Sequence, residues 1–241
     1  MTEHATNPSH ADGPTVVLVH GAWHAPWHWH QVVAGLTGEG VRVETVDLPS
    51  CGPDHGDLHD DAAAIRTVLD RQQDALLVAH SYGGIPATEG AAGHPSVRHI
   101  LYLSAYMADL GESLGGFEPP ADESNIHPEV DLAMTEKQLL IMKPERAREV
   151  LFHDCPDPDA AIEHLRPMNP AVLGQSPQSV VWKEIPASYV ITTDDRATAV
   201  SVQRRLSERA DQTYEIASGH SSFLAQPDQL CKIINSVAAA L

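Results

Sequence analysis

The sequence is poor in cysteine and has no long apolar run. Only Cys51, Cys155 and Cys231 occur in 241 residues. An odd, sparse set argues against a disulfide framework and predicts a reducing, cytoplasmic compartment. No run approaches the roughly 18 apolar residues of a membrane-spanning helix. The N-terminal stretch also lacks the apolar segment of a secretory signal, and we expect residues 1–13 to form a disordered tail.

Positive charge is scarce as well. The chain has 33 acidic and 15 basic residues, so its formal net charge is −18. Such a surface repels phosphate, which argues against nucleic acids and anionic membranes as partners. The length and the 42% hydrophobic composition predict one large domain with room for an inserted segment. We expect a monomer or a homodimer.

The most informative stretch surrounds Ser81. An apolar run over residues 75–78 predicts a buried strand, which Ala79 and His80 close. Ser81 is followed by a glycine pair, and a helix-compatible run begins at residue 85. A serine at a sharp turn between a strand and a helix is the context of a nucleophile elbow, whereas a serine beside glycine in an ordinary loop has no such flanks. The pattern therefore makes Ser81 a candidate nucleophile.

Strands and helices alternate over most of the chain. This alternation predicts an α/β fold with a mostly parallel sheet and helices on both faces. We expect strands at 15–20, 41–46, 75–80, 98–104, 187–193 and 213–217, and helices at 58–72, 199–210 and 227–241.

The alternation stops after residue 105. The stretch up to residue 186 is rich in proline and acidic residues, and it contains no convincing strand. Short helices are expected at 134–142, 144–152 and 159–165. We therefore predict a helical cap over residues 106–186, inserted between core segments 14–105 and 187–241. Because the cap follows the carboxyl end of a strand, it is expected to form the pocket and exclude water from it.

Three reactive groups follow predicted strand ends: Ser81, then Asp195 or Asp194, then His220. The carboxyl ends of parallel strands meet at one edge of a sheet, so these side chains can converge. A neutral imidazole can take the proton of the serine hydroxyl, and a carboxylate can orient that imidazole and stabilise its charged form. The pattern indicates a Ser-His-Asp triad.

Four motifs carry a family resemblance that extends from residue 15 to residue 241 and is loosest in the cap. They are VLVHGAW ending at Trp23, VAHSYGG (78–84), YVITTDDR (189–196) and SGHSSFLAQP (218–227). The chain resembles the α/β-hydrolases that include plant hydroxynitrile lyases, plant methylesterases and bacterial pyrethroid-hydrolase-like esterases. Position 79 departs mildly from the pattern, because it is alanine where the family usually has glycine.

The resemblance implies an α/β-hydrolase fold with about six strands in the order 2-1-3-4-5-6. It makes Ser81 the nucleophile and His220 the base. It selects Asp195 over Asp194 as the acid, because the family's acid directly precedes a basic residue. It also implies an oxyanion hole formed by the backbone N–H groups of Ala22 and Tyr82.

No cofactor and no metal are expected. The histidines at positions 20, 24, 28 and 30 have no neighbouring cysteine or carboxylate cluster, and the tryptophans between them indicate a helix start packed on the sheet. The aromatic and apolar residues that follow the strand ends are candidate pocket walls. They are Trp23, Tyr82, Tyr106, Met107, Phe117 and Phe223.

The predicted function is hydrolysis of a small carboxylic ester through an acyl-Ser81 intermediate. One alternative is a lyase that splits the C–C bond of a cyanohydrin. The related lyases have a lysine after the catalytic histidine, whereas this chain has Ser221, so the resemblance favours hydrolysis. A second alternative is a non-catalytic ligand-binding homologue, and the intact triad argues against it.

Overall fold

The computed structural model describes residues 13–53, 55–120, 123 and 125–241. Apart from Gly13, the tail expected over residues 1–13 lies outside this range. The centre of the fold is a parallel sheet of six strands in the order β2-β1-β3-β4-β7-β8, which is 2-1-3-4-5-6 when its strands alone are counted. Its strands are β1 Thr15–Val19, β2 Val43–Val46, β3 Ala75–His80, β4 Val97–Leu103, β7 Ala187–Thr192 and β8 Gln212–Ile216. The predicted fold class, strand order and parallel pairing are confirmed.

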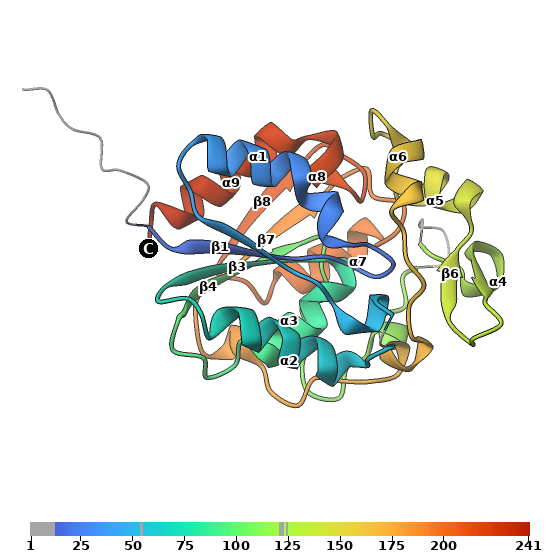
Figure 1. The fold of residues 1–241 in the computed structure, drawn as a ribbon, viewed down its shortest axis with the longest axis horizontal. Coiled ribbons are helices and arrows are strands. Elements are labelled where there is room, and N and C mark those ends of the chain that lie inside the picture. Colours follow the sequence, from blue (N-terminus) through green and yellow to red (C-terminus); the bar gives the residue numbers. More distant parts are fainter. Residues whose placement is uncertain (1–12, 54, 121–122, 124) are drawn as a thin grey trace, which may run out of the picture.

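Strands β1, β3 and β7 are buried along their whole length, because helices cover both faces of the sheet. Helices α1, α8 and α9 lie together over one face, and α2 and α3 lie over the other (Figure 1). These helices are α1 His30–Gly38, α2 Leu58–Leu69, α3 Gly84–Gly90, α7 Val200–Ser207, α8 Ser222–Ala225 and α9 Pro227–Ala238. Local chemistry fixes their ends. Asp57, for example, caps α2 by accepting hydrogen bonds from the backbone N–H groups of His59 and Asp60.

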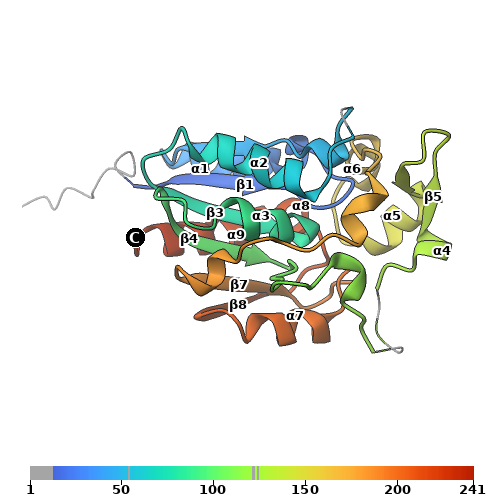
Figure 2. The ribbon, with the colours of Figure 1, turned by 90° about the horizontal axis from the view of Figure 1, so that it is seen from below.

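The middle of the excursion between β4 and β7, from α4 to α6, lies beyond one end of the sheet (Figures 1 and 2). It contains α4 Pro128–Asp131, β5 Leu132–Met134, β6 Leu140–Met142, α5 Pro144–Val150 and α6 Pro158–Glu163. The expectation of a helix over 134–142, and of no strand in this segment, is wrong. Instead, β5 and β6 pair as an antiparallel hairpin, and the backbone of Leu140 exchanges two hydrogen bonds of 2.8 Å with Met168. Strands of three residues are too short to show the alternation that identifies a strand in sequence.

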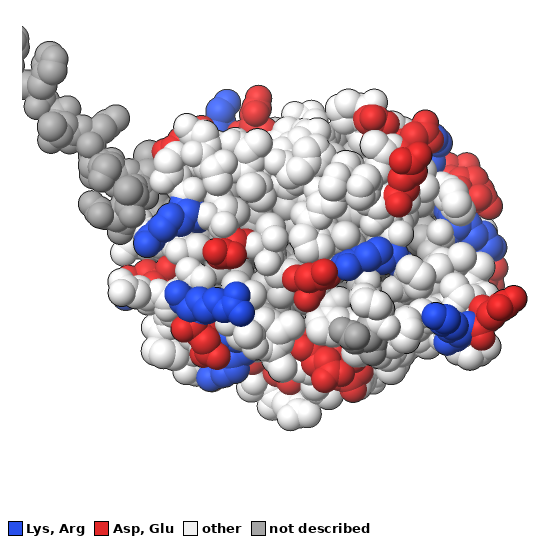
Figure 3. All heavy atoms as spheres, viewed as in Figure 1, with Lys and Arg blue, Asp and Glu red and all other residues white. Residues whose placement is uncertain are grey.

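Single-turn 3-10 helices complete the chain. They are η2 Pro26–Trp29, η3 Pro49–Cys51, η4 Ser81–Gly83, η5 Leu114–Gly116, η6 Pro170–Leu173 and η7 Val181–Lys183. No helix within the described ranges is long and apolar enough to cross a bilayer. On the face shown in Figure 3, acidic and basic side chains are interspersed. The negative charge is thus dispersed over this face.

Candidate active site

Ser81 sits at a strained turn between β3 and α3. Its φ is +53°, in the left-handed region that a residue with a Cβ rarely adopts. The turn is so tight that a Cβ on Gly83 would lie 2.3 Å from the carbonyl oxygen of His20. Only glycine allows that approach between the turn and the end of β1. Ser81 therefore lies at the carboxyl edge of the sheet, where it lines a cavity.

Asp195 and His220 form a buried pair. Nδ1–H of His220 donates to Oδ2 of Asp195 over 2.8 Å, and the residues are 1% and 5% exposed respectively. The carboxylate accepts four further hydrogen bonds, from the side chains of Thr192 and Gln203 and from the backbone N–H groups of Ala197 and Thr198. Five donors hold the Asp195 carboxylate in one orientation. Because Nδ1 of His220 donates to this carboxylate, Nε2 is the basic nitrogen of the imidazole.

Asp194 has different surroundings. Its side chain is exposed, and its backbone N–H donates to the Ser218 carbonyl over 3.0 Å. Its neighbour Asp195 carries the only carboxylate that bonds to the imidazole of His220 among the described residues. The geometry thus supports the choice of Asp195 over Asp194.

His80 connects the nucleophile turn to the His220 loop. It directly precedes Ser81, and its Nε2–H donates to the carbonyl of His220 over 3.1 Å. The two rings lie with their centroids 4.5 Å apart. Burial, followed by the proximity of His220, lowers the pKa of His80 well below its ordinary value, so the ring is neutral. The loop of His220 is also held by Asp154, which accepts from the Ser218 hydroxyl at 2.9 Å and the Gly219 N–H at 2.6 Å.

Ala22 and Tyr82 line the same cavity as Ser81. The N–H of Tyr82 is in the first turn of a helix, where backbone donors have no intrahelical acceptor. The N–H of Ala22 donates to no other group within the described part of the chain. The Tyr82 side chain points into the protein, where its hydroxyl donates to the buried carboxylate of Asp61 over 2.7 Å. Two free backbone donors therefore lie beside Ser81.

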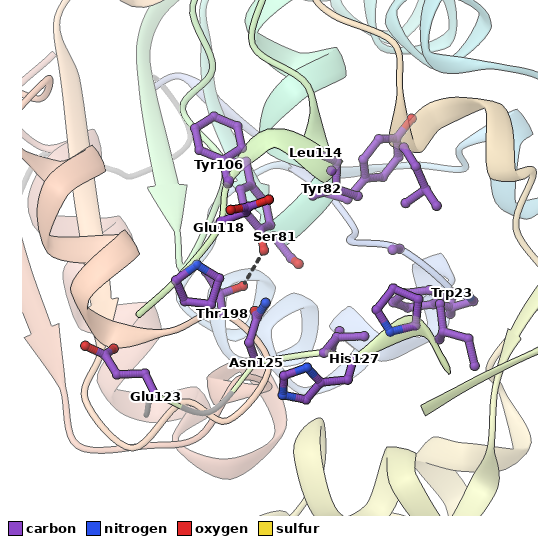
Figure 4. A pocket seen from close by; sticks show the side chains of 18 of the residues that line it. Trp23, Ser81, Tyr82, Tyr106, Leu114, Glu118, Glu123, Asn125, His127 and Thr198 are labelled. Carbon is purple, nitrogen blue, oxygen red and sulfur yellow. Dashed lines mark hydrogen bonds between the residues drawn. The ribbon is translucent and has the colours of Figure 1, made fainter. Parts of the chain in front are cut away.

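The cavity has a volume of about 400 Å³ (Figure 4). Of the residues predicted to line a substrate pocket, Trp23, Tyr106 and Phe117 belong to the wall of this cavity. Met107 and Phe223 do not. Met107 is fully buried in the core, and Phe223 packs edge-on against His80 at 4.8 Å. These two assignments need correction, because a residue's position after a strand end does not decide which way its side chain points.

Several wall residues escaped the sequence analysis. One of them is Thr198, which donates to the hydroxyl of Tyr106 over 3.5 Å (dashed line in Figure 4). Burial raises the pKa of Tyr106 to about 12. Most of the others come from the irregular first part of the excursion. They include Leu114, Glu118, Glu123, Asn125, Ile126, His127 and Leu132. The one sequence signal for them is that this stretch follows the carboxyl end of β4.

The histidines near the start of the chain bind protein groups. His20 and His24 each bond through Nδ1 to a backbone carbonyl, at 2.9 and 2.7 Å. His28 bonds to Ala25 and Ala161, and His30 is exposed. Across residues 13–53, 55–120, 123 and 125–241, no group of three or more His, Cys, Asp or Glu side chains is arranged to hold a metal ion.

The fold, the strained serine at the carboxyl edge of the sheet and the buried Asp–His pair are typical of the α/β-hydrolase class. In agreement, residues 16–233 match the model of the alpha/beta hydrolase family, and the chain belongs to that family. It is 28% identical over 246 residues to the α/β hydrolase nvfD of Aspergillus novofumigatus, covering 93% of this chain and 96% of the relative. It is 26% identical over 250 residues to the pyrethroid hydrolase of Sphingobium wenxiniae, with 93% and 88% covered.

A solved structure agrees with the fold. The pyrethroid hydrolase of Sphingobium faniae JZ-2 superposes with a TM-score of 0.80 over 94% of this chain and 97% of that chain, at 24% identity. At that level of identity the likeness concerns the fold. The expected membership of the α/β-hydrolases is confirmed.

Proposed function

We propose that the chain is a cofactor-free carboxylesterase that uses Ser81, His220 and Asp195 as a triad. Nε2 of His220 takes the hydroxyl proton as Ser81 Oγ attacks the ester carbonyl. The N–H groups of Ala22 and Tyr82 stabilise the oxyanion of the tetrahedral intermediate. His220 then gives its proton to the departing alcohol, which leaves an acyl-Ser81 ester. Water, activated by the same imidazole, hydrolyses this ester to the carboxylic acid.

One observation carries this proposal. The imidazole of His220 is held by a buried hydrogen bond of 2.8 Å to Asp195. The loop of His220 is in turn bonded to His80, which directly precedes Ser81. This arrangement fixes the imidazole on the loop that His80 ties to the turn of Ser81, and the strained turn places the serine in the cavity wall. The family relatives that are named as hydrolases support the same reaction class.

The pocket wall supports an uncharged substrate. Most of the wall is apolar, and its ionisable groups include the carboxylates of Glu118 and Glu123. Among the described residues that line the cavity, none is lysine or arginine. A substrate with a free carboxylate therefore has no lysine or arginine partner in this wall and meets the like charges of the two glutamates, so small neutral esters fit best.

The test uses p-nitrophenyl acetate and a fluorophosphonate label. Ser81→Ala should lower kcat by roughly 10⁵–10⁶ and abolish labelling, because triad members act as a unit. The folded state of the variant is checked by circular dichroism and thermal unfolding. A variant that keeps more than a tenth of the activity would overturn the assignment. Absence of turnover by the wild-type chain across a panel of simple esters would favour the non-catalytic alternative.

Hydrolysis is favoured over cyanohydrin cleavage by Ser221. Its side chain is buried and neutral, with a hydroxyl that has no hydrogen-bond partner among the described residues. It therefore supplies no positive charge beside His220 for a departing cyanide ion. Mandelonitrile cleavage and ester hydrolysis are measured at one pH near 7, with the Ser81→Ala rate subtracted from each. Faster cyanide release than hydrolysis of every ester tested would contradict the esterase proposal.

A further inference from the structure

Arg166 reaches from the excursion to the loop that carries Ala22. Its backbone N–H donates to the carbonyl of Trp23 over 2.7 Å. Its guanidinium donates to the next carbonyl, that of His24, through Nε at 3.2 Å and Nη2 at 3.1 Å. A single residue, 142 positions away in sequence from His24, therefore binds two consecutive peptide groups of this loop.

The other carbonyls of the loop are bound too. The carbonyl of Gly21 accepts from Nδ1–H of His20 at 2.9 Å, and that of Ala22 accepts from Nδ1–H of His24 at 2.7 Å. Nη2 of Arg166 also lies 3.2 Å from Nε2 of His20, which accepts from a backbone N–H. With the carbonyls at positions 21–24 all engaged, the peptide planes of the loop are fixed. The Ala22 N–H lies in the same peptide plane as the Gly21 carbonyl, and Arg166 holds the peptide groups that follow Trp23 and His24 on the C-terminal side of this plane.

The loop needs this support because it is strained. Trp23 has a φ of +61°, in the left-handed region that a residue with a Cβ rarely adopts. Such a conformation persists only where neighbouring contacts enforce it, and the two peptide groups bound by Arg166 follow directly. The guanidinium is itself anchored by Asp47, which accepts from Nη2 at 2.7 Å. A planar guanidinium can contact a carbonyl, a ring nitrogen and a carboxylate together, whereas a lysine ammonium has no comparable fork.

We propose that Arg166 is a positioning residue for the oxyanion hole, holding the loop so that the Ala22 N–H meets the developing oxyanion. The inference rests on the proposed ester hydrolysis. It predicts that Arg166 matters for the transition state and little for the ground state, because the side chain is absent from the cavity wall. Loss of one complete oxyanion donor costs about 10²–10³ in rate, and a displaced donor costs less.

The experiment compares Arg166→Gln, Arg166→Lys and the matched control Arg148→Gln. Arg148 lies in the same excursion and pairs with Asp159 at the surface, so it controls for the loss of a cation there. Active sites are counted with the fluorophosphonate, so that kcat is expressed per labelled serine. We expect kcat per site to fall about tenfold to a hundredfold in Arg166→Gln, with KM within threefold. Arg166→Lys should recover only part of the loss, and Arg148→Gln should match the wild type.

A second readout separates positioning from general damage. An alkylboronic acid forms a tetrahedral anion on the serine, and its inhibition constant should rise in Arg166→Gln in parallel with the fall in kcat/KM. The apparent pKa of the rate profile should stay unchanged, because Arg166 does not contact the His220–Asp195 pair. If kcat per site stays within twofold of the wild type, or the boronic acid binds undiminished, the inference is wrong. If Arg166→Gln does not fold, Arg166→Lys and Asp47→Asn decide on the same two readouts. Failure of the wild-type chain to hydrolyse any ester would instead refute the proposed function.

Discussion

His28 should make the protein sensitive to acid. The ring is 1% exposed, accepts a hydrogen bond from the Ala25 N–H at 3.0 Å, and donates through Nε2–H to the Ala161 carbonyl at 3.1 Å. Protonation would remove the acceptor and bury a charge. Burial accordingly lowers the pKa of His28 from 6.5 to about 3, and the backbone bonds offset only part of that effect.

The direction and the size of the change in folding stability follow from the linkage between protonation and folding. The pKa of His28 is lower in the folded state than in the unfolded state. Below pH 6.5, His28 therefore binds a proton in the unfolded chain but stays neutral in the folded protein. Stability is therefore greatest above pH 6.5 and falls as the pH falls toward about 3. At pH 5, 1.5 pH units below the unfolded value, the loss is about 2 kcal/mol. His24 and His80, whose pKa values burial also lowers, act in the same direction. The free energy of unfolding of native proteins is typically about 5–15 kcal/mol, so a loss of this size is a substantial fraction of it.

The assay is urea unfolding at pH 8 and pH 5 for the wild type and His28→Gln. Glutamine keeps a donor but cannot titrate, so the loss of stability between the two pH values should be smaller by about 2 kcal/mol in the variant. His30→Gln is the control, because His30 is exposed and lies two positions after His28. If the free energy of unfolding of His28→Gln depends on pH as strongly as that of the wild type, His28 is not responsible for the acid sensitivity. An equal reduction of this pH dependence in His30→Gln would mean the same.

Three further outcomes are expected. Asp195→Asn should lower kcat/KM by about 10³–10⁴, whereas Asp194→Asn should stay within a few-fold; equal losses would mean that the wrong carboxylate was chosen. Gly83→Ala should reduce both thermal stability and fluorophosphonate labelling, because its Cβ would meet a backbone oxygen, while Gly38→Ala meets nothing within 4 Å and should be harmless. A methyl ester with a free carboxylate should show a KM several-fold above that of a neutral analogue, and Glu118→Gln and added salt should narrow the gap; a lower KM for the anionic ester would contradict the charge argument.

The elbow could be predicted because its determinants are local. A buried strand, a serine and a glycine pair are adjacent in sequence, and the close contact at Gly83 explains why a small residue is needed there. The boundaries of β1, β3, β4 and β7 agree within one residue for the same reason, since largely apolar runs mark strands that are buried on both faces. The order of the strands came from the family resemblance and not from the apolar pattern.

The pocket wall could not be predicted in the same way. Tyr106 and Met107 are adjacent, yet one lines the cavity and the other is in the core. The chain turns just before them at Ser104, whose φ is +41°, and no sequence pattern predicts this turn. Phe223 also follows a strand end, that of β8, yet its ring packs against His80 and is absent from the wall. Arg166 gave no signal at all, because its partners lie more than a hundred positions away.

The excursion between β4 and β7 is divided between two tasks, and this has a consequence for recombination between relatives. Its first part, from Leu114 to Leu132, supplies much of the cavity wall. Its later part bonds to the loops that carry His220 and Ala22, through Asp154 to Gly219 and through Arg166 to Trp23. A graft limited to the first part can therefore change which esters are accepted while turnover persists. A graft of the whole excursion also replaces the contacts that hold both loops, so it should lose rate even when the new pocket fits its substrate.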